Sequence, residues 1–114
     1  MMQNWNDYRE SLMERVGDFA KQSPDVMRGL MTMDNAAAKS GYLDSKIHEL
    51  IAIAVAVTTR CDGCISVHTK KAVEAGASLE EISEALGVAI ALNAGAALTY
   101  SARVIETYQQ LPGK

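Results

Sequence analysis

The sequence predicts an all-α fold: a single domain, residues 1–114, built as a bundle of about six helices. Apolar residues make up 48% of the chain but aromatic residues only 5%, so the apolar mass is Ala, Val, Ile, Leu and Met, which suits closely packed helices. Proline occurs only twice. Several segments repeat their apolar residues at helical spacing, and 114 residues is an ordinary size for one domain.

The first two helices are predicted from an apolar stripe and a start signal. Residues 6–21 form the first, with apolar side chains about one turn apart: Tyr8, Leu12, Val16 and Phe19. Ser23 and Pro24 then provide an N-cap and a first helical residue for the second helix, which ends before Gly41. Its stripe consists of Met27, Leu30 and Met31, and these methionines, with Met33, are expected in the core.

The third helix is expected at residues 45–59, after an N-cap at Asp44. The apolar run 51–57 is not assigned to a strand, because it continues from Ile47 with a capped start and exceeds strand length. Apolar residues occupy both faces of this helix, so it must be buried on all sides. A chain of this size has few such places, and we therefore expect it to associate into homo-oligomers.

Three further helices follow in the prediction. Gly76 ends the fourth as a left-handed C-cap. Ser78, with Glu81 three residues later, forms a capping box for the fifth at residues 79–93. The segment Asn93–Ala94–Gly95 is interpreted as a break before a sixth helix at residues 96–109. The small residues of this region allow close helix contact and also favour association: Gly87, Ala89, Ala91, Ala94, Gly95, Ala96 and Ala97.

Charge and composition exclude several classes of protein. The net charge is −3 and the eleven Lys and Arg are scattered, which argues against nucleic acid or an anionic membrane as a partner. The longest charge-free apolar stretch, residues 85–98, is shorter than the ~18 residues of a membrane span. The first residues lack the basic and apolar regions of a signal peptide, so a cytoplasmic location is expected.

Chemistry is concentrated in one short segment. Cys61 and Cys64 are the only cysteines, and His68 follows one helical turn later. On a helical wheel these three lie on the inner face of the fourth helix, opposite Ser66, Lys70 and Glu74. The i, i+3 spacing permits a disulfide. A thiolate at a helix start is favoured by the free N–H groups and the helix dipole, and an imidazolium one turn away would add to this.

Glu49 is the fourth candidate, because it shares a face of the third helix with Ile53 and Ala56. A carboxylate among apolar side chains needs a cation or donor as partner, and His68 is a candidate. In a simple hairpin that turns near residue 61, however, Glu49 lies opposite residue 73, an offset of about 7 Å. Periodicity therefore leaves open whether Glu49 and His68 touch.

Other interpretations fit the same residues. The cysteines are also compatible with small buried hydrophobes, and Cys61, Cys64, His68 and Glu49 with a zinc site, although the set lacks the usual second pair of ligands. His48 shares a face with Ile51 and Val55 and is interpreted as a core histidine without a role. Arg60 is either an aid to thiolate formation or an exposed cation at a helix end.

The spacing of the four candidates resembles a known family signature. Eleven residues separate Glu49 from Cys61, two separate the cysteines, and three separate Cys64 from His68. This pattern resembles that of the AhpD-like alkylhydroperoxidases of the carboxymuconolactone decarboxylase superfamily. The flanking segments 43–52, 68–72 and 74–77 are similar to the core of that family, and the resemblance covers about residues 24–106.

The resemblance implies an oligomeric, AhpD-like all-α fold, as a trimer or hexamer, and a thiol-dependent peroxidase. By position, Cys64 is the peroxidatic nucleophile, Cys61 the resolving thiol, and Glu49 with His68 the proton relay. The substrate is a hydroperoxide, the electron donor an external dithiol or disulfide reductase, and no cofactor or metal is implied. The best-known members carry His immediately before the second cysteine, where this chain has Gly63. The decarboxylase branch generally lacks the Cys pair; an acid–base enzyme or a zinc-stabilised module is the alternative.

Overall fold

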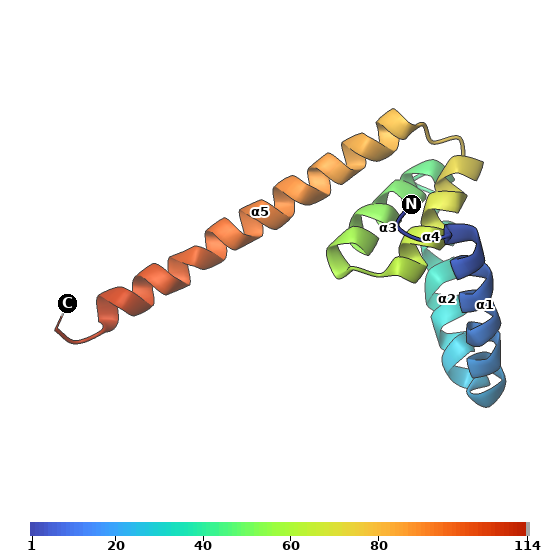
Figure 1. Cartoon of the computed structure of the whole chain (residues 1–114), viewed down its shortest axis with the longest axis horizontal. Helices are drawn as coiled ribbons and strands as arrows, with labels where there is room; N and C mark the ends of the chain where they lie inside the picture. Colours follow the sequence, from blue (N-terminus) through green and yellow to red (C-terminus); the bar gives the residue numbers. More distant parts are fainter. Residues whose placement is uncertain (114) are drawn as a thin grey trace.

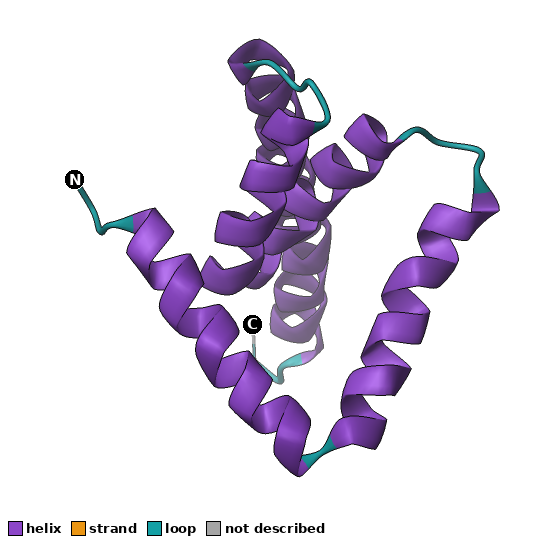
Figure 2. Cartoon of the chain, turned by 90° about the vertical axis from the view of Figure 1, so that its right-hand side faces the viewer, coloured by secondary structure: helices purple, strands orange, loops and turns teal. Residues whose placement is uncertain are grey.

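The computed structural model describes residues 1–113, and these form helices joined by short turns, with no strand among them (Figure 2). The described chain has five helices: α1 (Trp5–Gln22), α2 (Pro24–Ser40), α3 (Ser45–Thr59), α4 (Asp62–Glu74) and α5 (Leu79–Gln110). The predicted all-α class is therefore confirmed, and the start and end residues of the first four helices lie close to those expected from the sequence.

The helical hairpin of α3 and α4 is the centre of the structure. α5 packs against α3, whereas α1 packs against α4 and forms a V with α2 (Figures 1 and 2). The far half of α5 projects away from the other helices as a long arm. The radius of gyration is 19.0 Å, against about 13 Å for a compact chain of this length. The protomer is thus far more extended than a closed bundle.

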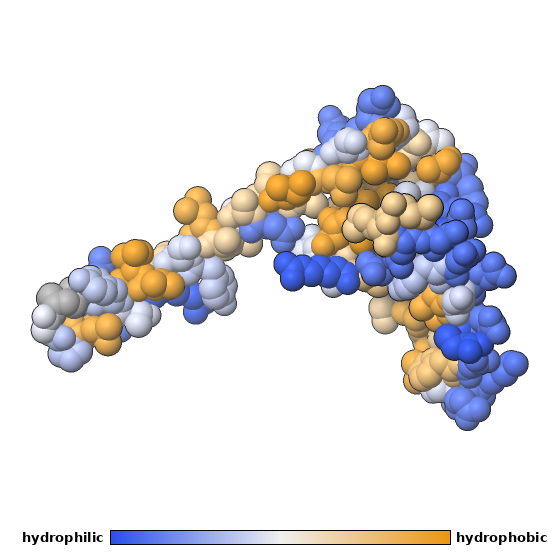
Figure 3. Space-filling view, in the orientation of Figure 1, coloured by the Kyte–Doolittle hydropathy of each residue, from blue (hydrophilic) through white to orange (hydrophobic). Residues whose placement is uncertain are grey.

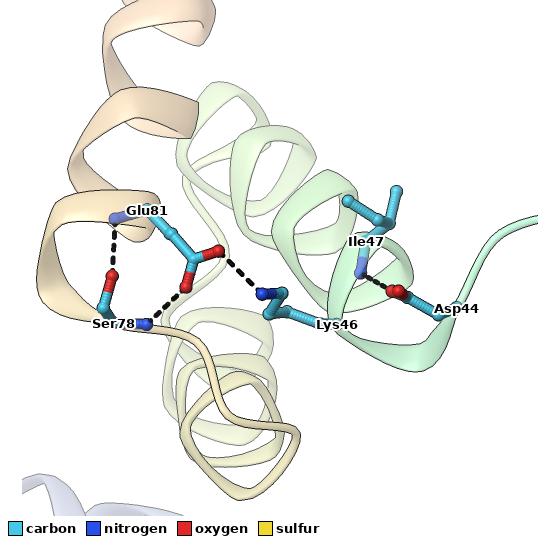
Figure 4. A network of polar contacts seen from close by, with 5 residues as sticks. All are labelled: Asp44, Lys46, Ile47, Ser78 and Glu81. Atoms are coloured by element: carbon cyan, nitrogen blue, oxygen red, sulfur yellow. Dashed lines mark hydrogen bonds and ion pairs between the residues drawn. The ribbon is translucent and has the colours of Figure 1, made fainter.

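Most helix ends carry the capping groups that the sequence predicts. The Asp44 side chain accepts a hydrogen bond from the N–H of Ile47, and Ser78 and Glu81 form the expected reciprocal capping box (Figure 4). Gly41 and Gly76 follow α2 and α4 with positive φ angles of 75° and 90°, a conformation that glycine adopts without steric cost. These local signals fix where the helices begin and end.

An ion pair joins the starts of α3 and α5. The Lys46 ammonium lies 2.7 Å from a Glu81 carboxylate oxygen (Figure 4). The hydrogen bond to Glu81 raises the pKa of Lys46, and the hydrogen bond from Lys46 lowers the pKa of Glu81. Glu81 therefore stays ionised at pH values below its ordinary pKa of 4.5, and Lys46 stays protonated at pH values above its ordinary pKa of 10.5. The contact holds α5 against α3 across the neutral range of pH.

The prediction of two helices after Ser78 was wrong, because α5 continues without interruption through Asn93–Ala94–Gly95. Asn93 is held within the helix: its side-chain amide donates to the carbonyl of Ala89 at 2.7 Å and to the Thr58 hydroxyl at 3.0 Å. A glycine inside a helix costs only about 1 kcal/mol, and the alanines on either side favour helix. The cost of Gly95 is therefore too small to end α5.

Little of the apolar surface is buried within one protomer. The buried apolar residues are Ile53, Ala56, Ala72 and Ala89. On α3, Ile53 and Ala56 are covered, whereas Ile51 and Val55 remain about half exposed. Of the methionines expected in the core, Met31 and Met33 are exposed and Met27 is partly buried. Within residues 1–113, the helix that packs most extensively against α2 is α1.

Apolar side chains are exposed along the whole of α5, as Figure 3 shows on one face. The charge-free stretch 85–98 is shorter than a membrane span, but the residues beside it extend the apolar segment. By length and composition alone, α5 is the one helix within residues 1–113 that could cross a membrane. Contiguous exposed apolar patches of this extent are typical of interaction sites.

Candidate redox and acid–base site

The two cysteines are joined at the start of α4. Cys61 and Cys64 form a disulfide, with their Cα atoms 5.2 Å apart, as the i, i+3 spacing permits. Cys61 is the N-cap residue, and its sulfur accepts a hydrogen bond from the backbone N–H of Cys64 at 3.1 Å. The helix start therefore directs an N–H group at the sulfur of Cys61, and a donor in this position stabilises negative charge on the sulfur.

Glu49 and His68 are in direct contact. The Nδ1 atom of His68 lies 2.7 Å from the Oε2 atom of Glu49, and the two side chains are only 25% and 18% exposed. The sequence left this contact open. The chain reverses tightly at Arg60, which adopts a left-handed conformation with φ 57°. The contact shows that α3 and α4 do not keep the register of a simple straight hairpin.

The four candidates thus form two pairs on one hairpin. Within residues 1–113, no hydrogen bond joins the His68 ring to either sulfur, but His68 follows Cys64 by one helical turn, a rise of about 6 Å. The Glu49 carboxylate fixes the Nδ1 side of the imidazole and leaves the Nε2 side free for proton transfer.

A pocket of about 450 Å³ opens beside the Glu49–His68 pair. Both residues line it, together with His48 from α3, Lys71 from α4 and Asp34 from α2. The prediction that His48 is a core histidine was wrong: it is partly exposed and lies in this pocket. The end of α2 lines the other side of this pocket, so an open space and not a packed side chain lies beside His48. Neither cysteine lines the pocket.

The opposite face of α4 is covered by α1, which the sequence did not predict. Ser66, expected among the solvent-facing residues, is only 5% exposed. The Arg9 guanidinium donates to its hydroxyl at 3.1 Å, and that hydroxyl donates to the Trp5 carbonyl at 3.4 Å. No pattern in the sequence indicates that residues about sixty positions apart, such as Arg9 and Ser66, are in contact. Lys70 and Glu74, expected on the same face, are exposed as predicted.

Gly63, between the two cysteines, lies against the Leu12 side chain of α1, which would have to shift to admit a side chain at this position. A Cβ atom at this position would lie 2.7 Å from the Cδ2 atom of Leu12, far inside van der Waals contact. In this chain, Leu12 occupies the space beside the Cys61–Cys64 turn that a side chain at position 63 would fill.

We expect Gly63→Ala to lower the melting temperature of the protein, because overpacking against Leu12 costs about 1–3 kcal/mol. In a Leu12→Ala background the same substitution should be neutral, or stabilising by up to ~1 kcal/mol, since alanine favours helix over glycine. Thermal denaturation of the four proteins in this double-mutant cycle measures the difference. An equal effect of Gly63→Ala in both backgrounds would contradict the contact.

The geometry gives no support to the zinc interpretation. Among residues 1–113, no group of three or more His, Cys, Asp or Glu side chains is placed to hold a metal ion. In the disulfide form the two sulfurs are bonded to each other, and neither is a thiolate that could bind zinc. Arg60 is exposed at the end of α3, which agrees with its interpretation as a helix-end cation.

Comparison with known proteins agrees with the sequence signature. The model of the carboxymuconolactone decarboxylase family matches residues 24–107, about three quarters of the chain. The chain belongs to the carboxymuconolactone decarboxylase family. Family members include decarboxylases and alkylhydroperoxidases. The matched residues contain Glu49, Cys61, Cys64 and His68. They exclude α1, the helix that packs against α4 beside the Cys61–Cys64 turn.

Individual relatives of the chain cover nearly all of it. An uncharacterized protein of Haemophilus influenzae is 48% identical over 108 residues, which are 95% of this chain and 96% of that protein. The structure resembles a carboxymuconolactone decarboxylase family protein from Legionella pneumophila, solved in its apo form, with a TM-score of 0.74 and 35% identity over 93% of this chain and 95% of that one. A protein from Methanobacterium thermoautotrophicum gives a TM-score of 0.70 and 31% identity over 75% of this chain and 97% of that one.

Proposed function

We propose that this carboxymuconolactone decarboxylase family member is a thiol-dependent peroxidase that reduces hydroperoxides. The observation that carries the proposal is the placement of a Cys61–Cys64 disulfide one helical turn from the Glu49–His68 pair. A redox-active dithiol needs a base to form its thiolate and an acid to protonate the leaving group. The hairpin of α3 and α4 carries both the Cys61–Cys64 pair and the Glu49–His68 pair.

In the proposed cycle, a hydroperoxide oxidises the two thiols to the disulfide, and an external reductant restores them. The Cys64 thiolate attacks the terminal oxygen of the hydroperoxide, and the O–O bond breaks. The other oxygen leaves as the alcohol after it takes a proton from the His68 imidazole. Cys64 becomes a sulfenic acid. The Cys61 thiol then attacks that sulfur, water leaves, and the disulfide forms. An external dithiol or a disulfide reductase supplies the two electrons and two protons that restore both thiols.

The hydrogen bond at the helix start suits the last step of the cycle. When an external thiolate attacks the sulfur of Cys64, Cys61 is the leaving group. A leaving thiolate departs faster when its negative charge is stabilised, and the Cys64 N–H already points at the Cys61 sulfur. This arrangement is consistent with Cys64 as the residue that exchanges with peroxide and reductant, and Cys61 as its partner.

We expect Glu49→Gln to reduce peroxidase activity without unfolding the protein. Glutamine keeps the size of the side chain and its hydrogen bonding, but it cannot stabilise a protonated His68. Without that cation, the fraction of Cys64 present as thiolate at neutral pH should fall by up to roughly tenfold, and the rate should recover partly as pH rises. The measurement is the pH dependence of Cys64 alkylation in the reduced protein, with melting temperatures recorded alongside.

His48→Gln is the matched control, because His48 is the neighbouring residue and lines the same pocket without contacting Glu49 by a hydrogen bond. It should leave the alkylation profile of Cys64 unchanged. Superimposable profiles of the wild type and Glu49→Gln would rule out the proton relay. A more stable Glu49→Gln protein with normal thiol reactivity would instead identify Glu49 as a purely structural carboxylate.

One observation favours a second candidate, an acid–base enzyme such as a decarboxylase. The Glu49–His68 pair lines the 450 Å³ pocket and the disulfide does not. A substrate in this pocket would meet a carboxylate, an imidazole and the free ammonium of Lys71. The two candidates differ in their need for sulfur: peroxide consumption requires both cysteines, whereas acid–base turnover would survive their replacement by serine.

The remaining parts of the proposal are the setting and the assembly. The hydroperoxide is the substrate, a dithiol or disulfide reductase is the electron donor, and the protein acts in the cytoplasm. We propose a homo-oligomer on the basis of the exposed apolar surfaces of α3 and α5. The resemblance to the AhpD-like alkylhydroperoxidases implies that this oligomer is a trimer or hexamer.

A further inference from the structure

A second pocket, of about 560 Å³, lies between α1 and α4, on the face of α4 that is turned away from the disulfide. Trp5 and Arg9 line it from α1, and Ile65, Lys70 and Val73 line it from α4. In Figure 1 the start of α1 runs beside α4. Its volume falls within the range of about 300–1,000 Å³ typical of small-molecule sites.

The walls of the α1–α4 pocket are apolar over most of their area. The indole of Trp5 forms one wall, and the side chains of Ile65 and Val73 form the other. Val73 lines the pocket and is 60% exposed, because the pocket is open to solvent. An apolar group placed between these side chains would remove surface from water on both sides, which is the main source of affinity for such ligands.

The polar groups of the pocket carry an unbalanced positive charge. Arg9 is half-buried and bonds only to neutral acceptors: the hydroxyl and carbonyl of Ser66 at 3.1 and 3.5 Å, and the amide oxygen of Asn6 at 2.6 Å. Lys70 is the second cation. Glu74, which lies 4.0 Å from the Lys70 ammonium, is the one carboxylate in the lining. The guanidinium of Arg9 therefore has no ionic partner in the pocket.

We propose that the α1–α4 pocket binds a small amphipathic carboxylate. Its alkyl or aromatic group lies between Trp5, Ile65 and Val73, and its carboxylate pairs with Arg9 and Lys70. A carboxylate is the favoured ligand for a guanidinium because the two form charge-assisted hydrogen bonds. Trp5 and Arg9 precede residue 24, so this site lies partly outside the family-matched segment and is separate from the peroxidase chemistry.

The experiment uses the full-length protein and its single tryptophan, Trp5, as the reporter. Octanoate is titrated while the tryptophan emission is recorded, and octanamide, which has the same chain but no charge, is the matched ligand. We expect saturable binding of octanoate and an affinity for octanamide that is weaker by about tenfold or more, as for the loss of a charged hydrogen bond. Equal binding of the two ligands would overturn the proposal.

Three variants test the residues. Arg9→Gln should weaken octanoate binding by about tenfold, and Lys70→Gln by about threefold because Lys70 is more exposed. Arg15→Gln, on the same helix but paired with Glu14 and Asp18 away from the pocket, removes the same charge and should bind octanoate normally. Lys70→Gln leaves the packing of α1 intact and so remains informative if Arg9→Gln loosens the helix.

Two further results would contradict the assignment of octanoate binding to the α1–α4 pocket. The first is octanoate binding that none of the pocket variants weakens. The second is a Trp5 emission that responds to protein dilution but not to octanoate, which would show that a second copy of the chain fills the pocket. Neither result bears on the peroxidase proposal, which is tested by the cysteine and Glu49 variants.

Discussion

Replacement of Cys64 by serine is expected to abolish peroxide turnover. The proposed cycle begins with attack by the Cys64 thiolate, and a serine hydroxyl at neutral pH cannot replace it as a nucleophile toward the O–O bond. The expected loss is to the background rate of the buffer, measured as consumption of hydroperoxide with dithiothreitol as reductant. Since the backbone N–H of residue 64 still donates to the sulfur of Cys61, the N-cap residue of α4, the fold should be retained.

Cys61→Ser is the matched variant, because it removes the other sulfur of the same disulfide. It should allow one oxidation and then stop, with a sulfenic acid trapped on Cys64 that a dimedone-type reagent labels. Mass spectrometry after one equivalent of hydroperoxide distinguishes the two proteins. Turnover by Cys64→Ser, together with failure of Cys61→Ser to react at all, would reverse the assigned roles. Full activity of both variants would remove the peroxidase proposal altogether.

The second large effect concerns assembly. We expect the native protein to have a mass that is a multiple of 12.3 kDa, because one protomer buries so few of its apolar side chains. Leu98→Asp, at a position 75% exposed in the arm of α5, should dissociate the assembly and lower its melting temperature sharply. An unpaired charge buried in an interface costs roughly 3–5 kcal/mol, which corresponds to a shift of more than about a hundredfold in the association constant.

Gln109→Asp is the control for this experiment, since it adds the same charge near the end of the same helix at a position that is already polar. It should leave the mass unchanged. Light scattering during size-exclusion chromatography gives the masses of all three proteins. A wild-type mass near 12.3 kDa would contradict the expectation of an oligomer. Recovery of the protein only in detergent would assign the apolar surface of α5 to a membrane instead.

The sequence by itself determined the local structure and the chemical candidates. Helix starts are encoded by a few adjacent residues, so the caps at Asp44 and Ser78 could be predicted. The disulfide spacing is also local, because residues three apart on a helix are neighbours whatever surrounds them. The same property made the family signature recognisable. The error in α5 was local as well: Asn93 and Gly95 weaken a helix by too little to end it.

Only the tertiary structure decided which distant residues meet. The Glu49–His68 contact depends on how α3 crosses α4, which periodicity along either helix does not contain. The cover of α1 over Ser66, the close approach of Leu12 to Gly63, and the position of His48 in the pocket have the same origin. A helical wheel gives the direction of a side chain but not its neighbour, because the packing partner is chosen by the fit of surfaces far apart in the chain.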